Sequence, residues 1–64
     1  MKVNGEDVEN VCGMTIEQFL KIRGYDSSKS AVLLNGKVVP RAEFGSVPLR
    51  SSDDMEIVSF VGGG

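Results

Sequence analysis

The stretch TIEQFLKIRG, residues 15–24, decides the fold of this 64-residue chain. Within it, Ile16, Phe19 and Leu20 follow the i, i+3, i+4 spacing that places apolar side chains on one face of a helix. An apolar stripe of this kind needs a core to pack against. The spacing therefore predicts a helix over residues 16–23 that covers one side of a small sheet.

Both ends of this predicted helix carry boundary signals. Thr15 and Gln18 fit a capping box, in which the Thr hydroxyl accepts a backbone N–H and the Gln amide reaches back to the helix start. Gly24 provides the left-handed residue at which helices commonly stop. The caps and the apolar stripe predict the same helix boundaries, so we place the remaining elements relative to this helix.

A β-hairpin is predicted before the helix. Residues 1–4 and residues 8–11 alternate loosely between apolar and polar side chains. Between them, residues 5–7 include Gly and Asp, which are turn residues. We expect two short antiparallel strands joined by this turn.

A second hairpin is predicted after the helix. The apolar run at residues 31–34 is long enough for a buried strand and too short for a helix. The dipeptide Asn35-Gly36 that follows is the strongest short hairpin signal. Residues 38–39 return as a short strand, and Pro40 places that strand at a sheet edge.

The rest of the chain completes the sheet. Residues 41–49 are predicted to be irregular, with one helical turn near residues 42–44, and residues 51–54 form a polar turn. Residues 55–61 are predicted as the last strand. The order is ββαββ, an α+β fold with one mixed sheet of four to five strands, one helix across one face and a right-handed crossover.

The predicted core lies between the helix and the sheet. Its members are Met1, Val3, Val8, Ile16, Phe19, Leu20, Leu33, Met55 and Ile57. Leu33 rather than Leu34 is placed inward, although a continuous apolar run does not reveal its inward face.

Strand parity points two apolar side chains away from the helix. Glu56 is charged and should face solvent, so Val58 and Phe60 share its face of the sheet. An exposed apolar pair on so small a domain suggests an interface. We expect Val58 and Phe60 to bind a partner enzyme and so to position the folded domain on it. The alternative is that residues 41–49 fold over and cover these two side chains.

The composition argues against several classes of function. Seven Lys and Arg against nine Asp and Glu leave a net charge of −2, which argues against a nucleic-acid or anionic-membrane partner. The length allows one domain without a deep cofactor pocket. The chain has no His, the commonest general base at neutral pH. Its single Cys cannot form an internal disulfide, so we expect a cytoplasmic location. We also expect a monomer when the chain is free.

Three glycines, Gly62, Gly63 and Gly64, directly follow the last predicted strand. Glycine loses more conformational entropy on ordering than any other residue, so they add nothing to a core. We divide the chain into a domain over residues 1–61 and a flexible tail over residues 62–64. The tail is either a frayed terminus or a reactive end. In the second interpretation a partner enzyme with ATP adenylates the Gly64 carboxylate, while Gly62 and Gly63 thread a narrow channel.

Three segments carry a resemblance to a known family: TIEQFL at residues 15–20, AVLLNGKVVPR at residues 31–41 and EIVSFVGGG at residues 56–64. They resemble the ThiS family, sulfur carriers of thiamine biosynthesis with a ubiquitin-like β-grasp fold. The Asn-Gly followed by Val-Pro-Arg and the Phe-Val-Gly-Gly-Gly ending separate the chain from the related small subunits of molybdopterin synthase. One departure lies at residues 52–54, where Ser-Asp-Asp replaces the Asp-Gly-Asp that the family often has.

The resemblance implies a carrier rather than an enzyme. An E1-like enzyme would adenylate Gly64 with ATP, a sulfurtransferase or cysteine desulfurase would supply sulfur for a thiocarboxylate, and a thiazole synthase would take that sulfur. No residue would be catalytic, and no metal or cofactor would be bound. Three alternatives stay open: a ubiquitin-like protein modifier, a sulfur carrier for another pathway such as molybdopterin, and a β-grasp interaction or RNA-binding module.

Three further features have plainer interpretations. Cys12 is expected to be a small buried hydrophobe at the end of the second strand rather than a reactive thiol. Asp53-Asp54 is expected to form a solvated turn rather than a metal site, because two adjacent carboxylates lack further ligands. Arg41 is either a partner contact or an ordinary surface charge.

Overall fold

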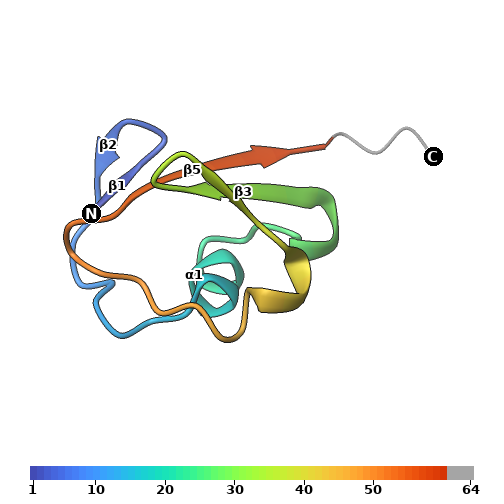
Figure 1. Ribbon diagram of the computed structural model, residues 1–64, viewed down its shortest axis with the longest axis horizontal. Coiled ribbons are helices and arrows are strands. Elements are labelled where there is room, and N and C mark those ends of the chain that lie inside the picture. Colours follow the sequence, from blue (N-terminus) through green and yellow to red (C-terminus); the bar gives the residue numbers. More distant parts are fainter. Residues whose placement is uncertain (61–64) are drawn as a thin grey trace.

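The structure, a computed structural model, describes residues 1–60 and consists of a curved sheet with one helix across one face (Figure 1). The strands are β1 (Lys2–Val3), β2 (Glu6–Asp7), β3 (Ser30–Leu34), β4 (Lys37–Val39) and β5 (Asp54–Ser59), and the helices are α1 (Ile16–Ile22) and the 3₁₀ turns η1 (Ser27–Lys29) and η2 (Arg41–Glu43). The predicted mixed sheet with a single covering α-helix is confirmed.

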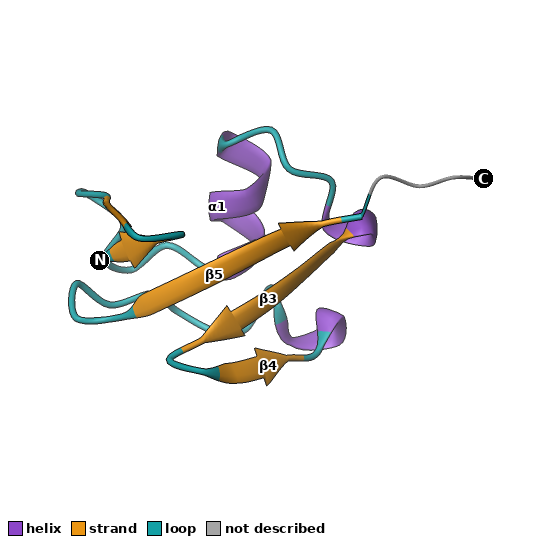
Figure 2. Cartoon of the chain, turned by 90° about the horizontal axis from the view of Figure 1, so that it is seen from above, coloured by secondary structure: helices purple, strands orange, loops and turns teal. Residues whose placement is uncertain are grey.

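The strand order in the sheet is β2-β1-β5-β3-β4. β5 lies in the middle, parallel to β1 and antiparallel to β3, and Figure 2 shows β5, β3 and β4 side by side. β4 lies at an edge of the sheet, as the Pro that follows it indicated. β5 is the last strand of the described chain and ends one residue before Phe60.

The caps of α1 form as the sequence predicts. The Thr15 N–H donates to Gln18 Oε1 at 2.9 Å, and the Gln18 N–H donates to Thr15 Oγ1 at 3.2 Å. The helix ends at Ile22, one residue before the predicted end, and Gly24 follows with a φ of +81°. Within residues 1–60, neither α1 nor the 3₁₀ turns have the length and apolar character needed to cross a membrane.

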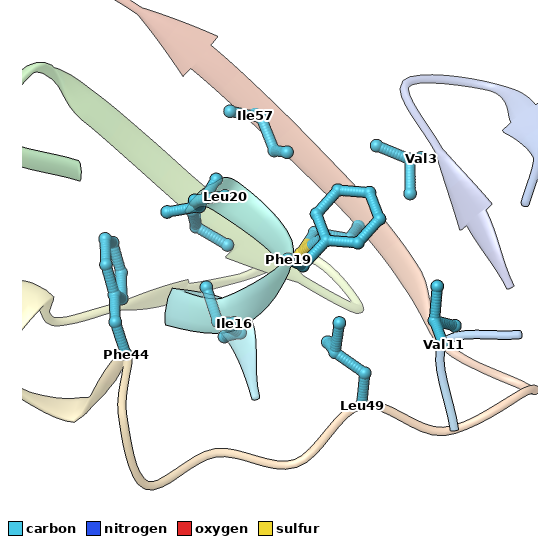
Figure 3. Close-up of a cluster of buried hydrophobic side chains, with 10 residues drawn as sticks. Val3, Val11, Ile16, Phe19, Leu20, Phe44, Leu49 and Ile57 are labelled. Atoms are coloured by element: carbon cyan, nitrogen blue, oxygen red, sulfur yellow. The ribbon is translucent and has the colours of Figure 1, made fainter. Parts of the chain in front are cut away.

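The core fills the space between α1 and the sheet (Figure 3). Its buried members are Val3, Val11, Ile16, Phe19, Leu20, Val32, Phe44, Leu49, Met55 and Ile57. Met1 and Val8, which the sequence placed inside, are only partly buried against it. Phe44 and Leu49 were not predicted; they enter the core because residues 44–49 run beside the helix start, where the Leu49 N–H donates to the Met14 carbonyl at 2.7 Å.

The prediction for the first hairpin is wrong in its position. The turn falls at Asn4-Gly5, where both residues are left-handed with φ values of +52° and +83°, and the second strand is Glu6–Asp7 rather than residues 8–11. Asn and Gly tolerate this conformation best, so the turn starts one residue earlier than predicted. Val11 then lies outside any strand and reaches the core from a loop.

The inward assignment of Leu33 is also wrong. In the register between β3 and β5, Val32 lies opposite Ile57 and Leu34 lies opposite Met55. Since Ile57 and Met55 face the helix, Val32 and Leu34 do so too, and Val32 is fully buried. Leu33 lies opposite Glu56 on the other face of the sheet.

Candidate functional site

The sheet face that α1 leaves uncovered carries apolar side chains beside the end of β5. Val58 is 49% exposed and Phe60 is 55% exposed, while Met55 and Ile57 are buried. The parity prediction for β5 is therefore confirmed. Residues 41–49 do not cover the pair, because they run on the helix side of the sheet, as Figure 1 shows.

Neighbouring strands extend this apolar face toward the sheet edge. Ala31 lies opposite Val58, and Leu33 lies opposite Val38, which is 71% exposed. We call Val58, Phe60, Ala31, Leu33 and Val38 the outer patch. The sequence analysis missed the last three members, because they depend on the pairing of β3 with β5 and β4. No local signal indicated Val38, because an outward Lys37 would by parity have placed the next residue inward.

The described chain ends where the outer patch ends. The Phe60 N–H donates to the Lys29 carbonyl at 2.7 Å, which extends the pairing of this segment one residue past β5. Gly62, Gly63 and Gly64, together with Val61, lie outside the described residues. The division at residue 61 and the reactive role of Gly64 thus stay predictions.

Arg41 lies on η2 with an exposed side chain. Its Nε–H donates to the Ser27 carbonyl at 2.9 Å, which ties η2 to η1. Close by, hydrogen bonds from the Ser28 hydroxyl and backbone N–H hold the pKa of Asp26 below its ordinary value, helped by the charges of Lys29 and Arg41. Arg41 therefore has a structural contact, and its role in docking stays a prediction.

Asp53 is not part of a solvated turn, which corrects the expectation from the sequence. Its side chain is 9% exposed; Oδ1 accepts from Asn35 Nδ2 at 3.0 Å and Oδ2 accepts from the Arg50 N–H at 2.9 Å. Asn35 Oδ1 in turn accepts from the Asp54 N–H at 2.9 Å. This set of bonds, the Asn35–Asp53 network, ties the β3–β4 turn to the start of β5. Across residues 1–60 no three His, Cys, Asp or Glu side chains gather as metal ligands would.

Cys12 is exposed and lies in the loop between β2 and α1. The expectation of a buried residue at a strand end is wrong. β2 ends at Asp7, and in the loop that follows it is Val11, 4% exposed, that enters the core. The neighbouring Cys12 side chain consequently faces solvent.

Comparison with known proteins places this chain in a family. The family model of the ThiS family matches residues 1–64. The chain is 40% identical over 62 residues to proteins named thiazole synthase from Paramagnetospirillum magneticum and Magnetococcus marinus. The match covers 97% of this chain and only 19% of each of those proteins, so the chain spans about a fifth of their length.

Solved structures agree with the family match. A crystal structure of a thiamine biosynthesis protein (ThiS) from Geobacter metallireducens is 27% identical to this chain, with a TM-score of 0.76 over 98% of this chain and 96% of that one. An NMR structure of a thiamine biosynthesis protein from the same organism gives a TM-score of 0.77 at 27% identity, over 98% of this chain and 85% of that one. The β-grasp prediction is thereby confirmed. Because the family model matches every residue from the first strand to the terminal glycines, the chain belongs to the ThiS family.

Proposed function

We propose that this chain is a sulfur carrier for thiazole formation in thiamine biosynthesis. The observation that carries the proposal is the match to the ThiS family over residues 1–64, which includes the three terminal glycines. In this function an E1-like enzyme activates the Gly64 carboxylate, and a thiazole synthase receives the sulfur that Gly64 then carries. The chain is a substrate of these enzymes and does no catalysis itself.

The chemistry takes place at the terminal carboxylate in three steps. A carboxylate oxygen of Gly64 attacks the α-phosphorus of ATP on the partner and displaces pyrophosphate, which leaves an acyl-adenylate. A sulfur nucleophile supplied by a sulfurtransferase or cysteine desulfurase then attacks the carbonyl carbon and expels AMP. When that nucleophile is a persulfide on the donor, the product is an acyl disulfide; a thiol then attacks the donor-side sulfur, forms a disulfide with the donor and releases the thiocarboxylate. Gly62 and Gly63 have no Cβ atoms, so they enter a narrow channel in many backbone conformations.

The folded body contributes the binding energy in this proposal. The outer patch lies beside the end of β5, so a partner that covers Val58 and Phe60 also receives the chain end at once. An aromatic side chain that is buried by the partner next to the reacting end holds that end in position. Arg41, at the same end of the molecule, is proposed as a polar contact at the rim of that interface.

The relatives named thiazole synthase support the second partner. In those proteins a segment similar to this chain makes up 19% of a longer polypeptide. A segment joined to an enzyme in one polypeptide meets that enzyme at a high effective concentration. This arrangement supports a thiazole synthase as the enzyme that meets this chain after sulfur has been loaded.

Deletion of Gly64 tests the carrier function. We expect the truncated chain to melt like the full chain, because Gly64 has no side chain to pack in a core, and to form neither adenylate nor thiocarboxylate with an E1-like enzyme, ATP and a sulfur donor. Intact mass spectrometry measures the loading. Gly63→Phe should fail in the same way, because its side chain blocks the channel.

A Cys12→Ser variant is the matched control for sulfur bound to Cys12 instead of Gly64. Cys12 is exposed and could pick up sulfur as a persulfide, so the variant must load to the level of the unaltered chain. Sulfur loading of a Gly64-deleted chain that also carries Cys12→Ser, or loss of loading in the folded Cys12 variant of the full chain, would refute the carrier function of Gly64. An isopeptide adduct in place of a thiocarboxylate would identify a protein modifier instead.

A further inference from the structure

Two Asn-Gly dipeptides lie in left-handed turns on either side of β5 in the sheet. Asn4-Gly5 joins β1 to β2, and Asn35-Gly36 joins β3 to β4. All four residues are exposed, with φ values of +52°, +83°, +53° and +83° in chain order. Asn followed by Gly is the sequence most prone to deamidation, because no side chain shields the Gly nitrogen from the Asn carboxamide. The two turns therefore share one chemical liability.

The structure restrains the two carboxamides to different degrees. Asn35 is bonded at both ends: Nδ2 donates to Asp53 Oδ1 at 3.0 Å, and Oδ1 accepts from the Asp54 N–H at 2.9 Å. Asn4 is bonded at one end, where Oδ1 accepts from the Ile57 N–H at 2.8 Å. Within residues 1–60 the Nδ2 group of Asn4 has no hydrogen-bond partner.

We propose that Asn4 is the residue at which the folded chain deamidates, and that the Asn35–Asp53 network protects Asn35. In the reaction the Gly5 nitrogen loses its proton and bonds to the Asn4 Cγ, and the carboxamide nitrogen leaves as ammonia. Water then opens the resulting succinimide at one of its two carbonyls, which yields aspartate or isoaspartate. The Asn carboxamide must first rotate out of its hydrogen bonds. Asn35 must break one bond more than Asn4, and that bond is to a carboxylate.

Deamidation at Asn35 and deamidation at Asn4 would also have different consequences for the fold. Aspartate at residue 35 would place its carboxylate where Nδ2 now lies, 3.0 Å from the Asp53 carboxylate, so the product opposes the fold. At residue 4 aspartate keeps an oxygen for the Ile57 N–H. Isoaspartate at residue 4 lengthens the main chain by one methylene between β1 and β2, and draws that oxygen away from β5.

Ageing of the full chain tests the proposal. The protein is incubated at mildly alkaline pH and physiological temperature, digested, and mapped by mass spectrometry, with isoaspartate detected by enzymatic methylation. We expect Asn4 to deamidate about ten-fold faster than Asn35, the factor that one additional charge-assisted hydrogen bond supplies. In concentrated urea the two rates should become similar, because both sites are Asn-Gly dipeptides preceded by an aliphatic residue.

The variant Asp53→Ala separates protection by the network from other causes. It removes the acceptor of Asn35 Nδ2, so we expect the Asn35 rate to rise about ten-fold in the folded protein while the Asn4 rate stays unchanged. Circular dichroism establishes that the variant is folded at the incubation temperature. Equal native rates at the two sites, a rate difference that persists in urea, or an unchanged Asn35 rate in folded Asp53→Ala would each overturn the proposal.

Discussion

Replacement of Phe60 by Ala measures what the outer patch contributes to docking. Phe60 is 55% exposed, and a Phe side chain buries about 150–250 Å² when fully covered. About 110 Å² of it is therefore left for a partner to cover. At about 25 cal/mol per Å², covering that area contributes up to about 3 kcal/mol, which corresponds to a roughly 100-fold change in Kd.

The same exposure predicts a smaller effect on folding. Since only about 90 Å² of the Phe60 side chain is already covered, the same coefficient predicts that Phe60→Ala lowers the free energy of unfolding by at most about 2 kcal/mol. Titration calorimetry with an E1-like adenylating enzyme measures the affinity, and thermal melting measures the stability. Phe60→Asp should weaken binding further, because it places a charge against an apolar surface.

Ile22 supplies a matched control. It is 69% exposed and lies on α1, across the sheet from the outer patch, so Ile22→Ala removes a comparable exposed hydrophobe from the other side of the molecule. We expect its Kd to stay within about two-fold of the unaltered chain, a change of under about 0.5 kcal/mol. Equal weakening by both substitutions, or unchanged affinity of Phe60→Ala, would refute docking through the outer patch.

Three further substitutions test the fold. Phe19→Ala should lower the free energy of unfolding, measured in urea, by about 3–5 kcal/mol, because the ring is 3% exposed in the core. A decrease below about 1 kcal/mol would contradict the packing of α1. Asp53→Ala should cost about 1–3 kcal/mol, since it leaves Asn35 Nδ2 and the Arg50 N–H without their acceptor. Because folding lowers the pKa of Asp26, the ionised carboxylate stabilises the folded state. This contribution to the free energy of unfolding is fully present above about pH 4 and is lost as the pH falls through the lowered pKa. Asp26→Asn should therefore flatten the fall of stability at acid pH, and an unchanged fall would show that Asp26 contributes no pH-dependent stability.

Local chemistry explains which parts of the fold could be predicted. The helix and its capping box depend on residues three and four positions apart, and Asn35-Gly36 forms its turn within four residues. Alternation along β5 placed Val58 and Phe60 outward because Glu56 identified the solvent face. The Gly tail and the family motifs are likewise contiguous stretches of sequence, so they indicate the family without any knowledge of which segments pack together.

What the sequence alone determined is therefore the set of elements, their order and the candidate site at the chain end. Only the tertiary structure decided that Leu33 faces outward, because four consecutive apolar residues look alike until β5 sets their register. It also decided that Asp53 is buried, through a hydrogen bond to Asn35, eighteen residues earlier in the chain. Contacts between near neighbours are encoded in short patterns, whereas the inward face of a strand and the partner of a carboxylate depend on which distant segment packs beside them.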